Sequence, residues 1–188
     1  MLRPPGIVGA RSRKEVTPVD WYLIVLRAVH ILTAVFWVGS FYIFFFFVEP
    51  SVKELGPIGG QFMGHLAQKK KMPIVIAITA ATTIVAGTLL YWRVSDGFNV
   101  DWITSATGVA FTVGALSAIV AFALGFVVVK PAIERMGAIG QGIATGTPPP
   151  EDQVAEMQRL GARLVLVGRI DLVLLTVAVI MMATARFL

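Results

Sequence analysis

Residues 21–48 read WYLIVLRAVHILTAVFWVGSFYIFFFFV, and this run decides the fold. A helix needs roughly 20 predominantly apolar residues to cross a bilayer, and the run exceeds that length. Including it, four apolar runs occupy residues 22–48, 73–92, 104–129 and 164–185. In hydrocarbon, backbone polar groups must be satisfied within their own helix, so each run predicts one transmembrane helix. The sequence therefore predicts an all-α chain, folded as a four-helix transmembrane bundle in a lipid bilayer.

The composition excludes several other classes of protein. Hydrophobic residues make up 56% of the 188 residues, above the roughly 45–50% of soluble domains, and the mean hydropathy is +0.79. Cysteine is absent, which excludes disulfides, thiolate metal sites and cysteine nucleophiles. The net charge is +5, but the basic residues flank the apolar runs. That placement indicates anionic lipid as the partner of these charges, and not nucleic acid.

The four runs form one domain, residues 21–188, preceded by a tail, residues 1–20, that we expect to be disordered or to lie on the membrane surface. The first helix is expected to end at Glu49-Pro50, because proline lacks an N–H and biases the preceding residue out of the helical region. Residues 51–60 contain Gly56-Pro57 and Gly59-Gly60, and residues 61–71 predict a short interfacial helix that ends in three lysines.

The later connections predict a helical extension outside the membrane. The second helix should begin near Pro73, because proline suits a first helical turn. The third is expected to run past the membrane through Lys130 toward Arg135, with a kink at Pro131. An amphipathic stretch from Glu151 should continue without a break into the fourth span. The bundle therefore gains a helical extension on the side of the first and third loops.

The basic residues near the helix ends predict the orientation. Five flank the spans on the side of the N-terminus and eight on the side of the long loops. Cytoplasmic loops carry the excess of Lys and Arg, so we expect loops 1 and 3 in the cytoplasm and both termini outside. The two groups are Arg11, Arg13, Lys14, Arg93 and Arg186, and Lys53, Lys69, Lys70, Lys71, Lys130, Arg135, Arg159 and Arg163.

Helix 1 carries a row of polar and aromatic residues at three- and four-residue steps: Arg27, His30, Thr33, Trp37 and Ser40. These residues share one face, which we expect to point into the bundle. Arg27 either snorkels to the interface or joins a cofactor site. His30 is either a neutral imidazole hydrogen-bonded to a neighbouring helix or the ligand of a haem or a metal ion. Trp37 is either part of the core or one wall of a cofactor slot.

Helix 4 predicts a buried ionic network near the loop-side interface. Asp171 lies about two turns inside the span, where an isolated carboxylate is costly, so it should be paired or protonated. Arg163 lies eight residues earlier on the same face, and Arg169 is a candidate partner of Glu49. The network is either structural or a relay for protons or cations.

The two histidines are too far apart to hold one haem within one chain. Helix 1 alone places about 27 Å between His30 and its loop-side end, and His65 follows in the loop. His65 is either a surface histidine or, with Met63, part of a soft copper site. His30 would therefore act alone, with a methionine such as Met181 or Met182, or with His30 of a second protomer. The sequence shows no phosphate loop, metalloprotease motif or catalytic triad, and we predict no catalytic residue.

The first helix resembles that of a known family. Arg27-Ala28-Val29-His30-Ile31-Leu32, followed by Trp37-Val38-Gly39, is similar to the opening helix of the copper-resistance D-like (CopD-like) bacterial membrane proteins, with a histidine seven residues before Trp-x-Gly. The end of helix 1 and Leu90-Tyr91-Trp92 fit uncharacterised four-helix relatives of that group. The helix also resembles, more weakly, the membrane-type protoporphyrinogen oxidase (HemJ), where the matching histidine is implicated in haem binding.

This resemblance implies the bacterial cytoplasmic (inner) membrane, copper handling or porphyrin chemistry, and a role for His30, with Trp37 and Gly39 beside it. Our favoured hypothesis is a non-catalytic multi-pass protein, either a homodimer or an accessory subunit of a larger membrane complex. In it, His30 holds haem b or a metal ion such as copper, flanked by Arg27 and Trp37. The alternatives are a copper transport or resistance protein and a membrane oxidase of porphyrin metabolism.

Overall fold

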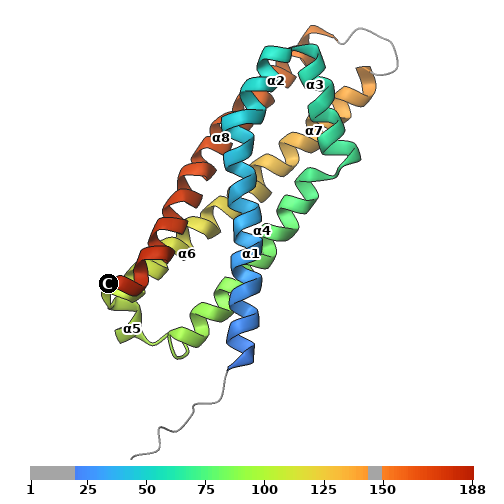
Figure 1. The fold of residues 1–188 in the computed structure, drawn as a ribbon. Coiled ribbons are helices and arrows are strands. Elements are labelled where there is room, and N and C mark those ends of the chain that lie inside the picture. The colour runs from blue at the N-terminus through green and yellow to red at the C-terminus, as the bar shows by residue number, and fades with distance from the viewer. Residues whose placement is uncertain (1–19, 144–149) are drawn as a thin grey trace, which may run out of the picture.

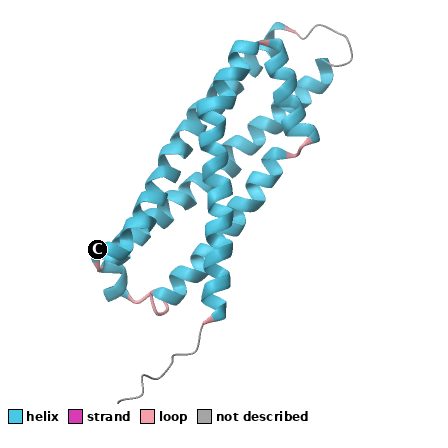
Figure 2. Cartoon of the chain, viewed as in Figure 1, coloured by secondary structure: helices cyan, strands magenta, loops and turns pink. Residues whose placement is uncertain are grey.

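A computed structural model gives the structure of the chain and describes residues 20–143 and 150–188. Within these ranges every regular element is a helix (Figure 2). Four continuous helical segments are long and apolar enough to cross a membrane: Trp21–Leu55, Met72–Val94, Ala106–Gly140 and Glu151–Phe187. They lie alongside one another along the length of the molecule (Figure 1). The predicted all-α four-helix bundle is confirmed, and the chain is a multi-pass membrane protein.

The first span does not end at Glu49-Pro50, so that prediction is wrong. Helix α1 (Trp21–Ile43) begins at Asp20, whose carboxylate accepts the N–H of Leu23 at 3.1 Å. It widens into the π-helical turn η1 (Phe44–Val48) and continues as α2 (Glu49–Leu55). In a regular α-helix the proline ring clashes with the carbonyl four residues earlier, and the wider turn before Pro50 displaces that carbonyl. The helix therefore passes through its proline.

The first loop contains the helix predicted over residues 61–71, but this helix begins earlier, at Pro57, and ends at Lys69. Gly56 has φ +55°, a conformation that glycine adopts without strain, and it separates α2 from α3 (Pro57–Gly64). The π-helical turn η2 (His65–Lys69) follows. Lys71, also at positive φ, leads into α4 (Met72–Val94), which carries Pro73 in its first turn as expected.

The second half also has a long helix that passes through a π-helical turn into a helix with an early proline. The short α5 (Val100–Thr104) precedes α6 (Ala106–Leu124), and Ser105 caps α6 by accepting the N–H of Gly108 at 3.1 Å. The π-helical turn η3 (Gly125–Val129) again stands before a proline, here at the start of α7 (Lys130–Ile143). Helix α8 (Glu151–Thr184) runs unbroken into the fourth span and ends in the 3-10 turn η4 (Ala185–Phe187).

The predicted extension beyond the third and fourth spans is confirmed. The guanidinium of Arg135 on α7 donates from Nε and Nη2 to the two carboxylate oxygens of Glu156 on α8, at 2.8 and 2.9 Å. This paired contact joins the two helices at the end where they project. The predicted tail, residues 1–20, lies outside the described residues apart from Asp20.

The bundle consists of two tight helix pairs. Helix α1 packs chiefly on α4 and α6 packs chiefly on α8, whereas the two pairs touch less extensively (Figure 1). Glycine permits one of the close approaches, since a Cβ at Gly114 would lie 3.2 Å from the carbonyl oxygen of Ala178. The pairs meet in one core cluster, which contains Trp37, Ala80, Ala118, Ala121, Leu175 and Ala178.

Candidate functional site

The imidazole of His30 is fixed in the interface between α1 and α4. Its Nδ1–H donates to the backbone carbonyl of Thr83 at 2.9 Å. A carbonyl can only accept, so the bond places a proton on Nδ1 and, in the neutral ring, leaves the Nε2 lone pair free. The predicted hydrogen bond to a neighbouring helix is therefore present, and it orients the ring without consuming its second nitrogen.

A missing side chain on α4 makes room for this ring. A Cβ built on Gly87 would lie 2.8 Å from Cε1 of His30, closer than real Cβ atoms lie, and 3.1 Å from Nδ1, which is a tight contact. One turn away, the hydroxyl of Thr83 donates to that of Thr33 at 2.9 Å, and Thr33 donates to the carbonyl of Val29 at 2.8 Å. The site thus consists of His30 and Thr33 on α1, with Thr83 and Gly87 on α4.

Sequence reasoning identified His30 and Thr33 but did not assign Thr83 or Gly87 to this site. The available signal was a stripe of small and hydroxyl residues along the second apolar run, Thr79, Thr83, Ala86 and Gly87, which by itself indicates only close packing. The position of the stripe opposite His30 depends on how α1 and α4 are rotated about their axes. Hydropathy does not specify that rotation, so the contact could not be predicted from the sequence.

The Nε2 atom of His30 remains available. In residues 20–143 and 150–188 it has no hydrogen-bond partner, and it is not among the polar atoms sealed inside the chain. Away from this interface, α1 presents apolar side chains outward, with Leu32 70% and Val35 66% exposed. An open apolar groove of about 370 Å³ follows the same interface, lined by Leu26, Val29, Ala81, Thr82, Val85, Ala86 and Leu89.

The other residues of the predicted polar face of helix 1 lie in different surroundings and do not join the His30 site. Trp37 is 3% exposed and belongs to the core cluster where the two helix pairs meet. Ser40 is half-buried and bonds back to the carbonyl of Phe36 at 2.7 Å. Arg27 is exposed on the surface of the chain, so the expectation that the whole face points inward is wrong at this residue. The reason is that the buried stripe of α1 follows the crossing with α4, to one side of Arg27.

The predicted ionic network does not form. Glu49 pairs with Lys53, one turn along its own helix, and not with Arg169. Arg163 and Arg169 are both exposed, and neither has an ion pair within the described part of the chain. Eight residues of α-helix rise about 12 Å, which separates Arg163 from Asp171 even on a shared face. Asp171 is instead 1% exposed, and both of its oxygens lack a hydrogen-bond partner among the described residues.

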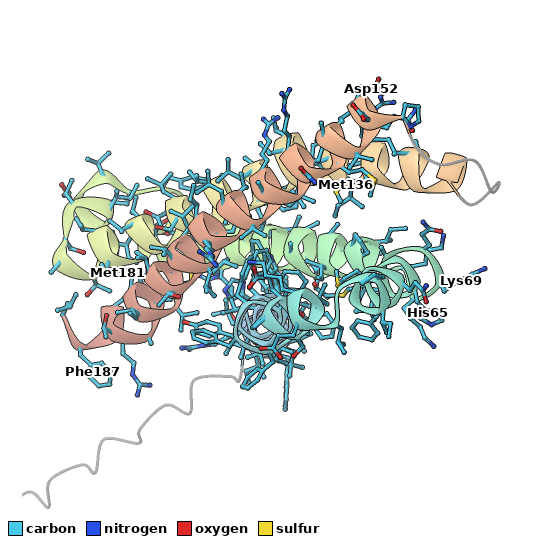
Figure 3. The ribbon with its side chains drawn as sticks, turned by 90° about the horizontal axis from the view of Figure 1, so that it is seen from above. His65, Lys69, Met136, Asp152, Met181 and Phe187 are labelled. Atoms are coloured by element: carbon cyan, nitrogen blue, oxygen red, sulfur yellow. The ribbon has the colours of Figure 1, made fainter. Side chains whose placement is uncertain are left out.

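His65 and the candidate methionine ligands lie elsewhere. His65 is exposed on η2, at the opposite end of the molecule from Met181 (Figure 3). Met181 and Met182 pack against Gly114 of α6, with the Cβ of Met181 3.5 Å from where a Gly114 Cβ would be. In the described ranges no three His, Asp or Glu side chains gather into a metal cluster. The haem or metal candidates at His30 therefore depend on that histidine alone within one chain.

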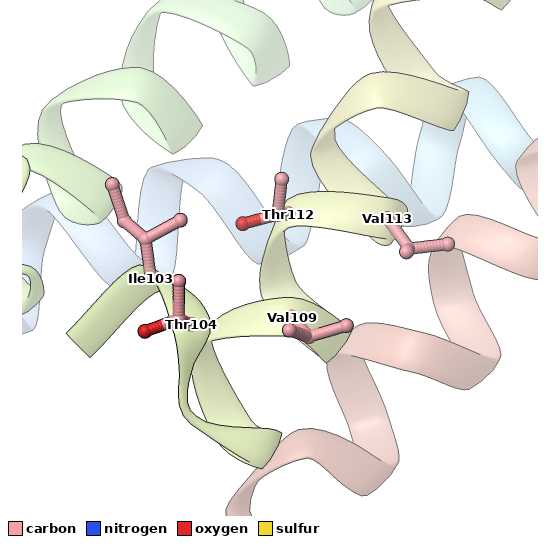
Figure 4. A pocket seen from close by; sticks show the side chains of 5 residues that line it. All are labelled: Ile103, Thr104, Val109, Thr112 and Val113. Carbon is pink, nitrogen blue, oxygen red and sulfur yellow. The ribbon is translucent and has the colours of Figure 1, made fainter. Parts of the chain in front are cut away.

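A second open groove, of about 410 Å³, lies at the start of the third span. Ile103, Thr104, Val109, Thr112 and Val113 line it (Figure 4). Thr112 is already engaged by the hydroxyl of Tyr91 at 2.6 Å. No ionisable side chain lines the groove, so its chemistry is that of an apolar surface exposed to lipid.

The resemblance of helix 1 to the CopD-like proteins and to HemJ stays a prediction, as do copper handling and porphyrin oxidation. Searches of protein-family models, of curated protein sequences and of solved structures return no match to this chain.

Proposed function

We propose that this chain is a non-catalytic membrane subunit that binds haem b through His30, with the site completed by a second copy of the chain. The observation that carries the proposal is the bond from Nδ1 of His30 to the Thr83 carbonyl. Histidines that ligate metals almost always donate their other ring N–H to a carbonyl or carboxylate, which fixes the tautomer and orients the ligating nitrogen. The residues present therefore suit an axial ligand of haem iron.

The surroundings of His30 favour a planar apolar ligand over a free metal ion. A metal ion held by the protein alone needs several donor side chains, and the described residues bring no other histidine or carboxylate cluster to this place. A haem brings four of its own nitrogen ligands and needs only one or two from the protein. An apolar groove runs along the same α1–α4 interface, although His30 is not among its lining residues, and its apolar walls match the macrocycle in character.

The second copy supplies the other axial ligand in this proposal. One chain offers a single oriented histidine, because His65 is exposed at the loop-side end of the molecule. A two-fold axis beside α1 would set the Nε2 atoms of two His30 side chains facing each other across the iron. Helix α1 has the surface for such a contact, since only 6% of the most apolar stretch of the first span is buried within the chain.

The setting that we propose is the bacterial cytoplasmic membrane, with loops 1 and 3 in the cytoplasm. This orientation follows the excess of Lys and Arg on the loop side. The dimer would serve as an accessory subunit of a larger membrane complex, since neither sequence nor structure offers a catalytic constellation among the described residues.

The test is a reduced-minus-oxidised absorption spectrum of the protein purified from membranes in mild detergent. We expect a Soret band in the wild type, its loss in His30→Ala, and its retention in His65→Ala, which removes a histidine far from the site. Native mass spectrometry should find one haem per two chains. A wild type with no Soret band, or a His30→Ala variant with an unchanged band, would refute the proposal.

A further inference from the structure

Asp171 is the one buried side chain in the described part of the bundle whose ionisable group has no partner of any kind. It is 1% exposed, and neither carboxylate oxygen has a hydrogen bond among the described residues. Moving an isolated carboxylate from water into a low-dielectric interior is far more costly than moving a neutral polar group. An ionisable residue inside a membrane span therefore points to a function until a structural partner is found for it.

The position of Asp171 on α8 defines what surrounds it. Gly168, one turn earlier, lies against the ring of Phe45 on η1, where a Cβ would come within 2.3 Å of Cζ. Leu175, one turn later, packs in the core cluster with Trp37 and with small residues of α6. Asp171 thus lies between two apolar layers, at the place where α8 meets α1 and α6.

No charged group faces Asp171 from the helices around it. The second span carries no Asp, Glu, Lys, Arg or His between Met72 and Trp92 of α4. The third span carries none between Ala106 of α6 and Val129 of η3. On α1, the hydroxyl of Tyr42 is hydrogen-bonded to that of Thr176 at 2.7 Å, and on α2 Glu49 pairs with Lys53. The remaining ionisable groups near this level are the exposed Arg163 and Arg169 on α8 itself, and Arg27 and His30 lie further along α1.

We propose that Asp171 is a proton-binding site in the core of the bundle, held in the packed state as the uncharged carboxylic acid. Its ligand is a proton delivered by water, since Na⁺ or Ca²⁺ would need several oxygen ligands and the adjacent layers offer aromatic rings and alanines. Proton release would leave a bare carboxylate, which the bundle accommodates only by admitting water between α1 and the α6–α8 pair. The contact between α1 and α8 is the less extensive one, so it is the place that opens.

The first test is infrared spectroscopy of the full chain in detergent at neutral pH. We expect the wild type to show the C=O stretch of a protonated carboxylic acid, and Asp171→Asn to lack it. Wild-type protein grown with aspartate ¹³C-labelled at the side-chain carboxyl should show the same band shifted by the isotope. The shift assigns the band to an aspartic acid, and its absence in Asp171→Asn assigns it to Asp171. A wild type without this band, labelled or not, would overturn the proposal.

The second test is the pH dependence of unfolding. A packed bundle that holds a proton which the unfolded chain releases must lose stability as pH rises. We expect the wild type to show this loss and Asp171→Asn to be insensitive over the same pH range. Glu49→Gln is the control, because it removes a buried but paired acid and should keep the wild-type dependence. Parallel loss of stability in the wild type and Asp171→Asn would refute the inference.

Discussion

Replacing Gly87 with alanine tests the contact on which the His30 site depends. The new Cβ would lie 2.8 Å from Cε1 and 3.1 Å from Nδ1 of the imidazole, so the ring must move, and we expect this movement to break its bond to the Thr83 carbonyl. Interhelical hydrogen bonds in membranes are worth about 0.6 kcal/mol on average, and over-packing costs typically about 1–3 kcal/mol. We therefore expect Gly87→Ala to lower the free energy of unfolding by about 2 kcal/mol.

The assay is a denaturation titration with sodium dodecyl sulfate in mixed micelles, followed by tryptophan fluorescence. Gly39→Ala is the matched control, because a Cβ at Gly39 meets nothing within 4 Å, and it should leave the midpoint unchanged or raise it. The decisive variant is Gly87→Ala made in a His30→Ala background. There the ring is gone and the substitution should cost nothing, since alanine is the better helix former.

The double-mutant cycle isolates the contact between residues 30 and 87. Equal costs of Gly87→Ala with and without the imidazole would refute the reasoning, because the loss would then come from the backbone of α4 and not from the ring. In the haem experiment, Gly87→Ala should also weaken the Soret band, while Gly39→Ala should not. An unchanged band in Gly87→Ala would show that orientation of the ring by Thr83 does not control ligation.

Three further outcomes follow from the packing. Gly168→Ala should destabilise the bundle by about 1–3 kcal/mol through the clash with the Phe45 ring, and Phe45→Leu should restore much of that loss in the same titration; no rescue would place the clash elsewhere. Arg135→Ala should leave the midpoint of the titration nearly unchanged despite the two bonds to Glu156, because the pair is exposed, and a marked loss of stability would mean that α7 supports the spans. Tyr91→Phe removes one bond to α6 and should lower stability by about 0.6 kcal/mol; a cost above about 2 kcal/mol would contradict this.

The spans and the extension were predictable from the sequence because hydropathy and proline placement act locally. The four apolar runs predicted the four spans, and the amphipathic stretch after Glu151 predicted an unbroken α8. The exception is Pro50, where local reasoning predicted a helix end. A π-helical turn relieves the proline clash, but its residues are as apolar as those of the α-helix before it. The sequence therefore contains no clear signal for the turn.

The site was only partly predictable, because it depends on which helices become neighbours. His30 stood out as a polar residue in an apolar run, and one of its two expected roles, a bond to another helix, is present. The ionic network was wrong because shared helical faces do not bring residues within reach when they are eight positions apart. Asp171 was expected to be paired or protonated, and the structure shows no partner for it among the described residues.

The division of the bundle into two pairs bears on how the polypeptide is made. The members of each pair follow one another along the chain, α1 with α4 and α6 with α8. The first hairpin can therefore associate in the lipid while the ribosome is still translating the second, and the halves need only dock afterwards. The connection between Val94 and Ala106 is then the natural place to divide the gene, and two co-expressed fragments should reassemble into the intact protein.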